Sequence, residues 1–204
     1  VGLVTVAMAI LMTGVTRLRV GDWLPWAGTL FLAAVALLAV LAGGPLMLLI
    51  AWAALDVVDL MLVLVQVRES ATREHAIFAL TARIAGMGFL IWAMLAASAQ
   101  GETLNFKVIP PGSSLYLLLA AGLRLGVIPL QAPLLGQLPI RRGLGTSLRL
   151  LPAASSLVLL VRAATVGVPQ EFTILLLLFT AVAALYSALS WLNAHTVLAA
   201  RPMW

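Results

Sequence analysis

The chain of 204 residues contains no cysteine and only two histidines. Without cysteine it cannot form a disulfide, a thiolate nucleophile, an iron–sulfur cluster or a cysteine-ligated zinc site. His75 and His195 lie far apart in the sequence, and neither has a second ligand at metal-binding spacing. We therefore expect no metal centre and no cofactor.

Charged residues are also scarce, at 9% of the chain, whereas hydrophobic residues make up 63% and the mean hydropathy is +1.14. This composition is typical of polytopic membrane proteins. A helix needs about 20 apolar residues to cross a bilayer. The sequence therefore predicts an all-α polytopic membrane helix bundle, a single domain over residues 1–204 with about seven transmembrane helices, the first of them short. The predicted helices cover residues 2–16, 23–42, 45–66, 76–98, 113–136, 146–168 and 171–194.

The basic residues lie in short loops rather than on one continuous face, so the net charge of +5 does not indicate nucleic-acid binding. By the positive-inside rule, the loops that carry most of the arginines face the cytoplasm. We expect the N-terminus outside and the C-terminus inside, because the arginines fall in every second gap. These residues are Arg17, Arg19, Arg68, Arg73, Arg141, Arg142 and Arg201, while the intervening gaps hold only Lys107 and the boundary residue Arg162.

Turn-forming residues separate the predicted helices, at Gly21-Asp22, Gly43-Gly-Pro45 and Ile109-Pro-Pro-Gly112. The segment from Arg68 to His75 is the most charge-dense part of the chain. We interpret it as a solvated cytoplasmic turn.

Arg124 lies in the middle of the apolar segment 113–136. A charge near the centre of a bilayer costs at least about 2.5 to 3.5 kcal/mol, so such residues usually face a bundle interior. Pro129 cannot donate to the carbonyl four residues earlier, and Pro133 removes a second donor. The pattern predicts a membrane helix that is broken within about one turn ahead of Pro129, around a polar interior.

Asp56 and Asp59 are three positions apart in the segment 45–66 and so share one face of the predicted helix. Two carboxylates one turn apart in an apolar environment cannot easily both ionise, so at least one is expected to be able to carry a proton. Three interpretations stay open. The pair could lock the bundle by binding a buried arginine, act in a proton relay, or contact a partner subunit.

Arg83, Arg124 and Arg149 are the arginines inside apolar segments. Arg83 can extend to the cytoplasmic interface or pair with Asp56 or Asp59, and Arg149 can extend in the same way. Arg124 cannot easily reach water, and its guanidinium does not deprotonate in proteins. We expect it within salt-bridge or single-water reach of one of the two aspartates, as a fixed counter-charge or as an electrostatic barrier.

From Trp52 onward, the order of these features resembles the antiporter-like membrane subunits of respiratory complex I and the related cation/proton antiporters. Those proteins carry a Trp-Glu pair, then Arg-x-Gly-Asp, then Gly-Lys-Ser-Ala-Gln-x-Pro-Leu on a broken helix. A Pro-x-Ser-Ala-Leu-Ile-His-Ala-Ala-Thr helix ending in arginine and an Asp-Ile-Lys-Arg-x-Leu-Ala-Tyr-Ser segment follow. The matching stretches here are Trp52-Ala53, Arg83-Ile-Ala-Gly-Met87, Gly101-Glu-Thr-Leu-Asn-Phe106, Leu123-Arg124-Leu-Gly-Val-Ile-Pro129-Leu130, Ser147-Leu-Arg149-Leu-Leu-Pro-Ala-Ala154 with Arg162, and Asn193-Ala-His195-Thr-Val-Leu-Ala199.

The chain departs from the family at the residues that move protons there. The family's glutamate falls on Ala53, its broken-helix lysine on Arg124, its helix histidine on Arg149 and its Asp-Ile-Lys on Asn193-Ala-His195. Asp56, one turn after Ala53, can take the place of the glutamate. Nothing replaces a lysine that can lose its proton. The resemblance covers the first half of the family's length, so a complete transmembrane route is expected to need another subunit.

The resemblance implies a subunit of a multisubunit NADH-quinone oxidoreductase-type complex in an energy-transducing membrane, such as the bacterial plasma membrane, bound to other membrane subunits and lipid. We expect a mainly structural, non-catalytic subunit in which Asp56, Asp59, Arg83 and Arg124 form a buried charged cluster that is a candidate for coupling to proton movement. One alternative is an active proton or cation translocator in which Asp56 or Asp59 titrates and His195 replaces the terminal lysine. Another is a membrane coupling subunit for inorganic carbon uptake.

Overall fold

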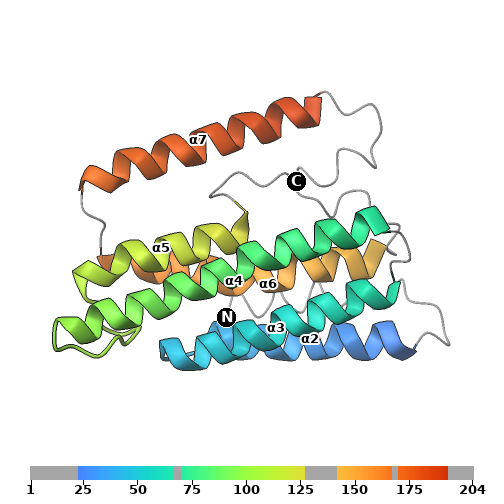
Figure 1. Cartoon of the computed structure of the whole chain (residues 1–204), viewed down its shortest axis with the longest axis horizontal. Coiled ribbons are helices and arrows are strands. Elements are labelled where there is room, and N and C mark those ends of the chain that lie inside the picture. Colours follow the sequence, from blue (N-terminus) through green and yellow to red (C-terminus); the bar gives the residue numbers. More distant parts are fainter. Residues whose placement is uncertain (1–22, 67–69, 127–141, 167–169, 193–204) are drawn as a thin grey trace.

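The computed structural model of the chain describes residues 23–66, 70–126, 142–166 and 170–192. The predicted helical bundle is confirmed for this part of the chain, where the only strand-like pairing is an isolated bridge between Asn105 and Val108. The first predicted helix, 2–16, lies outside the described residues. The helices of the described part, labelled as in Figure 1, are α2 (Trp23–Leu41), α3 (Pro45–Gln66), α4 (Ser70–Ala99), α5 (Pro111–Leu125), α6 (Arg142–Val166) and α7 (Gln170–Leu192).

Successive helices run in opposite directions, so that the bundle has two distinct ends (Figure 1). The end of α3 and the starts of α4 and α6 lie at one end. The α2–α3 turn and the loop between α4 and α5 lie at the other end. This up-and-down arrangement is the one that short connections between helices favour.

Helices α2 to α6 form a closed ring. Each packs against the next in the order α2, α3, α4, α5 and α6, and α6 returns to pack against α2. α7 lies outside this ring, as Figure 1 shows. The largest fully buried apolar side chains fill the interior of the ring: Leu32, Trp52, Leu55, Leu90, Leu117, Leu151 and Leu159.

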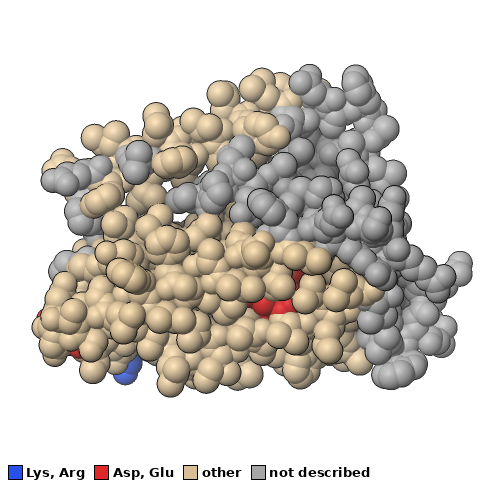
Figure 2. All heavy atoms as spheres, viewed as in Figure 1, with Lys and Arg blue, Asp and Glu red and all other residues tan. Residues whose placement is uncertain are grey.

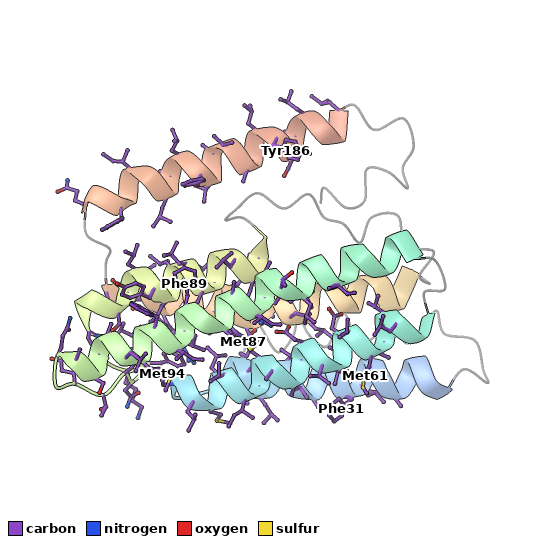
Figure 3. The ribbon with its side chains drawn as sticks, viewed as in Figure 1. Phe31, Met61, Met87, Phe89, Met94 and Tyr186 are labelled. Atoms are coloured by element: carbon purple, nitrogen blue, oxygen red, sulfur yellow. The ribbon has the colours of Figure 1, made fainter. Side chains whose placement is uncertain are left out.

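The outward faces of the helices are apolar. Figure 3 shows Phe31 on the outer side of α2, where 53% of its surface is exposed, and Met61 of α3 is 64% exposed. In the coloured part of Figure 2, which draws the described residues, charged atoms are few: acidic atoms lie near the middle and further charges lie at one end.

Among the described residues, three stretches are long and apolar enough to cross a membrane. They are Pro45–Leu64 in α3, Leu80–Ala99 in α4 and Phe172–Leu189 in α7. Shorter apolar stretches occupy parts of α2, α5 and α6: Leu30–Leu41, Gly112–Leu125 and Leu151–Val166.

Glycine and proline determine where α4 ends and where α5 begins. Gly101 has a left-handed φ of 75° and follows the end of α4, where the N–H of Glu102 donates to the carbonyl of Ala97 and that of Gly101 to Ser98. This pair of bonds is a Schellman motif, which glycine favours because it has no Cβ. Proline is tolerated in a first turn, and α5 accordingly begins at Pro111.

The start of α4 differs from the sequence prediction. The helix begins at Ser70, so most of the segment from Arg68 to His75 is helical rather than a turn. The reason lies in its composition. Alanine, arginine and glutamate are strong helix formers, and the segment contains no glycine or proline.

Candidate functional site

Charged side chains from neighbouring helices meet inside the ring. Asp56 and Asp59 come from α3, Arg83 from α4 and Arg124 from α5. We call these residues the charge cluster. Both aspartates are buried, as their place on one face of an apolar helix predicted. The cluster contains as many carboxylates as guanidinium groups, so it is neutral when both acids are ionised.

Arg124 and Asp56 form the inner ion pair of the cluster. Nη1 of Arg124 donates to Oδ2 of Asp56 at 2.7 Å, and Nη2 donates to Oδ1 at 2.8 Å. This two-point geometry is the strong form of an arginine–carboxylate pair. The expected contact between Arg124 and an aspartate is therefore present, and it is direct rather than through water.

Trp52, one turn before Asp56, covers the inner ion pair. The Cζ atom of Arg124 lies 4.4 Å from the centre of the Trp52 ring, which is a cation–π contact. The indole of Trp52 is completely buried. Its ring therefore shields the guanidinium from solvent while contributing an attraction that does not compete with Asp56 for hydrogen bonds.

Gly86 in α4 leaves the space through which Arg124 passes. A Cβ atom at this position would lie 3.0 Å from Cγ of Arg124 and 3.0 Å from the carbonyl oxygen of Ala120. Both distances are tighter than ordinary van der Waals contact. The close approach of α4 and α5 at this level thus depends on glycine.

Arg83 and Asp59 form the outer ion pair. Nη1 of Arg83 donates to Oδ2 of Asp59, and the same nitrogen lies 3.7 Å from Oδ1 of Asp56. Arg83 therefore stands between the two aspartates, with Asp59 as its hydrogen-bonded partner. Of the two roles predicted for Arg83, the structure shows pairing with the aspartates.

A hydrogen bond connects the cluster to α6. Nε1 of Trp52 donates to Oγ of Ser155 at 2.9 Å, and that hydroxyl in turn donates to the carbonyl of Pro152 at 3.0 Å. Pro152 lies inside α6, where its ring removes one helical hydrogen bond. Sequence reasoning did not find Ser155, because its partner is 103 residues away and no local pattern marks a buried serine as an acceptor.

Arg162 holds the other end of the bundle together. Its Nη1 donates to the carbonyl of Ala42 at 2.6 Å and its Nη2 to the carbonyl of Val40 at 3.3 Å, and its Cζ lies 5.3 Å from the centre of the Phe106 ring. It thereby satisfies carbonyls that the end of α2 leaves without helical donors. In the sequence, Arg162 is a boundary residue and a match to the arginine that ends a family helix. The sequence did not predict these contacts, because the partners are 120 and 122 residues away.

Three buried side-chain atoms of the described residues have no hydrogen-bond partner: Oδ1 of Asp59, Nε of Arg124 and Oγ of Ser156. No group of three acidic or histidine side chains in this part of the chain could hold a metal ion. Because a guanidinium does not deprotonate in proteins, the carboxylates are the groups of the cluster that can exchange a proton. The cluster can therefore pair charges and bind protons.

The remaining predicted residues lie outside what the structure describes. His195, Pro129 and Pro133 fall in undescribed segments, and the side chain of Arg149 is not described although α6 includes its backbone. α5 ends at Leu125, and Gly126 caps it with a left-handed φ of 73°. The helix that carries Arg124 therefore ends ahead of Pro129, within the turn where we expected an interruption.

Compared with protein-family models, with curated proteins and with solved structures, the chain shows no match. The resemblance to antiporter-like subunits stays a prediction from the sequence.

Proposed function

We propose that the chain is a membrane-embedded subunit of a multisubunit complex of the respiratory type, and that the charge cluster is an internal lock that holds α3, α4 and α5 together. In this role the chain is structural and not catalytic. The antiporter-like resemblance supplies the class of complex, and the bundle supplies the argument for the lock.

The observation that carries this proposal is the distribution of polarity. The charges of the cluster lie inside the ring, while the outward faces of α2, α3 and α4 expose large apolar side chains, among them Leu38, Ile50 and Ile84, each at least 50% exposed. In water this arrangement would expose far more apolar surface than soluble monomers do. In a bilayer it is favourable, because hydrocarbon surrounds the apolar faces and each charged side chain of the cluster has an oppositely charged partner.

The geometry of the cluster supports a lock rather than an open pathway. Arg124 keeps its charge, binds Asp56 at two points and is covered by Trp52. Breaking a buried pair by removing one partner costs about 3 to 5 kcal/mol, because it leaves an uncompensated charge. The cluster therefore penalises any arrangement in which the three helices separate.

α7 supports the assignment to a larger assembly. None of its membrane-length apolar stretch, Phe172–Leu189, is buried against the rest of the described chain. Ile174, Leu177 and Leu185 are each more than 60% exposed. A helix that is apolar all round requires lipid or other membrane helices as its surroundings.

The second candidate is an active proton or cation translocator, and one observation favours it. Oδ1 of Asp59 is buried and has no hydrogen-bond partner, which leaves one carboxylate oxygen of the cluster uncommitted. Intramembrane acids in this condition are found in proton relays.

Alkaline carbonate extraction followed by native mass spectrometry of the detergent-solubilised chain tests the proposal. We expect the chain to stay in the membrane pellet and to be recovered in a complex with further membrane subunits of constant stoichiometry. Release by carbonate, or recovery only as a single chain in a micelle, would contradict it.

The variant Asp56→Asn separates the two candidates. If the cluster is a lock, the variant loses assembly, because Arg124 is left without a charged partner. If the chain translocates protons, the variant assembles normally while proton uptake by reconstituted vesicles is lost. The matched control is Glu102→Gln, which removes an acid from the exposed α4–α5 loop and is expected to change neither result.

A further inference from the structure

The two aspartates of the charge cluster are held very differently. Asp56 receives two hydrogen bonds from Arg124 and has Arg83 within 3.7 Å, so both of its oxygens are committed. Asp59 has one hydrogen-bonding partner, Arg83, and its Oδ1 is buried without one. Both oxygens of Asp56 are therefore engaged by arginine, whereas one oxygen of Asp59 is free to take a proton.

The consequences of neutralising the two acids also differ. A proton on Asp56 would leave Arg124 with no carboxylate, since Arg124 has no other ion pair among the described residues. A proton on Asp59 would leave Arg83 with Asp56, which Nη1 already approaches to 3.7 Å. A shift of less than about 1 Å brings that distance into the hydrogen-bond range.

Accessibility points to the same acid. The side chains of Arg83 and Asp59 are 14% and 8% exposed, whereas those of Arg124 and Asp56 are 2% and 3% exposed. Arg83 and Asp59 thus form the outer edge of the cluster. The outer ion pair is therefore less buried than the inner one.

We propose that Asp59 is the proton-binding residue of the charge cluster, and that Arg83 moves from Asp59 to Asp56 when the proton binds. A proton from hydronium adds to Oδ1 of Asp59, and water is left behind. The cluster passes from neutral to a single positive charge, shared by two guanidinium groups around Asp56. This proposal rests on the proposed function, because it treats the cluster as a buried part of a membrane subunit. It adds that protonation of Asp59 weakens the contacts that hold the three helices together.

Among the side chains that the structure describes, the charged groups near Asp59 are the other members of the cluster, Asp56, Arg83 and Arg124. α2, which packs along α3, contains no titratable residue in its sequence. α4 contributes Arg83, and it also carries Arg73, Glu74 and His75, whose side chains lie outside the described residues. α5 contributes Arg124, which is bound to Asp56. α6 carries Arg162, whose guanidinium is bound to carbonyls at the end of α2, and the side chains of Arg142 and Arg149 lie outside the described residues.

Infrared spectroscopy of the full chain in lipid bilayers tests the proposal. The chain contains three aspartates, Asp22, Asp56 and Asp59, so labelling aspartate with carboxyl-¹³C in an Asp22→Asn background restricts the signal to the cluster. On acidification we expect a labelled carbonyl stretch of a protonated carboxylic acid. It should be lost in Asp59→Asn, which we expect to fold because Arg83 keeps Asp56 and the asparagine carbonyl.

A second measurement follows Arg83 directly. Solid-state NMR between the ¹⁵N-labelled guanidinium of Arg83 and the ¹³C-labelled carboxylate of Asp56 should report a shorter distance after acidification than before it.

Several outcomes would overturn the proposal: the stretch persisting in Asp59→Asn, no stretch at any pH at which the chain stays folded, an unfolded Asp59→Asn chain, or an unchanged distance from Arg83 to Asp56. None of these results affects carbonate extraction or subunit co-purification. Failure of this proposal is therefore distinguishable from failure of the proposed function.

Discussion

Gly86 and Arg124 depend on each other at the closest approach of α4 and α5. In Gly86→Ala, the new methyl group would meet Cγ of Arg124 and the carbonyl of Ala120 at 3.0 Å each. We expect a loss of about 1 to 3 kcal/mol in the free energy of unfolding, which is typical of overpacking. Denaturant unfolding of the purified chain in detergent measures it.

Gly88 is the matched control, because it lies on the same helix and a Cβ there has no neighbour within 4 Å. Gly88→Ala should leave stability unchanged or raise it by up to about 1 kcal/mol, since alanine is the better helix former. Equal losses of stability in both variants would show that crowding of the new methyl group against Arg124 is not the cause of the loss in Gly86→Ala.

At this scale the sequence predicted that charges would pair but not how. Burying Arg124 without a carboxylate is costly enough to require a partner, and Asp56 and Asp59 were the available acids. Their spacing leaves both acids on one face, so it cannot tell which arginine binds which acid. The choice depends on how far along α4 and α5 the two arginines lie relative to the aspartates of α3, and on the space that Gly86 leaves.

At the scale of the helices, Arg162 joins α6 to the end of α2, so replacing it tests that contact. Arg162→Met keeps the apolar stem but removes the hydrogen bonds to the carbonyls of Ala42 and Val40. Hydrogen bonds to charged groups contribute about 1.5 to 3 kcal/mol, and we expect a loss of that size in unfolding free energy.

The control for Arg162 is the neighbouring Val161→Ala. Val161 is 65% exposed, so this change should stay within about 0.5 kcal/mol. Hydrogen exchange gives a second reading. Faster exchange confined to the last turn of α2 in Arg162→Met would agree with its capping role, whereas unchanged exchange there would contradict it.

The helices themselves were largely predictable, because apolar runs bounded by glycine and proline carry the signal. Gly43-Gly-Pro45 separates α2 from α3, and Pro110 and Pro111 set the start of α5. The start of α4 was not predictable from charge alone. Its charged residues were interpreted as a turn, yet they form a helix because hydrophilicity does not oppose helix formation.

At the scale of the whole molecule, the alternation of arginines along the sequence predicts the side of the membrane on which each loop lies. The start of α4 and the loop between α4 and α5 lie at opposite ends of the bundle (Figure 1). Ser70→Cys and Lys107→Cys should therefore react with a membrane-impermeant thiol reagent from opposite sides, the first from the cytoplasm. The cysteine-free parent chain supplies the background.

Lys107 suits this experiment better than the nearby Ser113, which is buried and donates its hydroxyl to the carbonyl of Ala93. Reaction of both cysteines from the same side would contradict a membrane-crossing α4.

The closure of the ring, by contrast, was not predictable from the sequence. The contact of α6 with α2 joins distant segments, and short connections alone do not determine it.

A double-mutant cycle on Asp56 and Arg124 tests the central claim most directly, namely that the cluster is a buried, mutually compensating lock. Asp56→Leu leaves Arg124 without a carboxylate, and Arg124→Leu leaves Asp56 and Asp59 to share Arg83 as their one counter-charge among the described residues. We expect each variant to lower the free energy of unfolding in detergent by about 3 to 5 kcal/mol. The double variant keeps the pair of Arg83 and Asp59 and stays neutral. We predict that it recovers most of the loss. If the losses in the double variant instead add, the two residues do not stabilise the bundle through each other and the lock is contradicted.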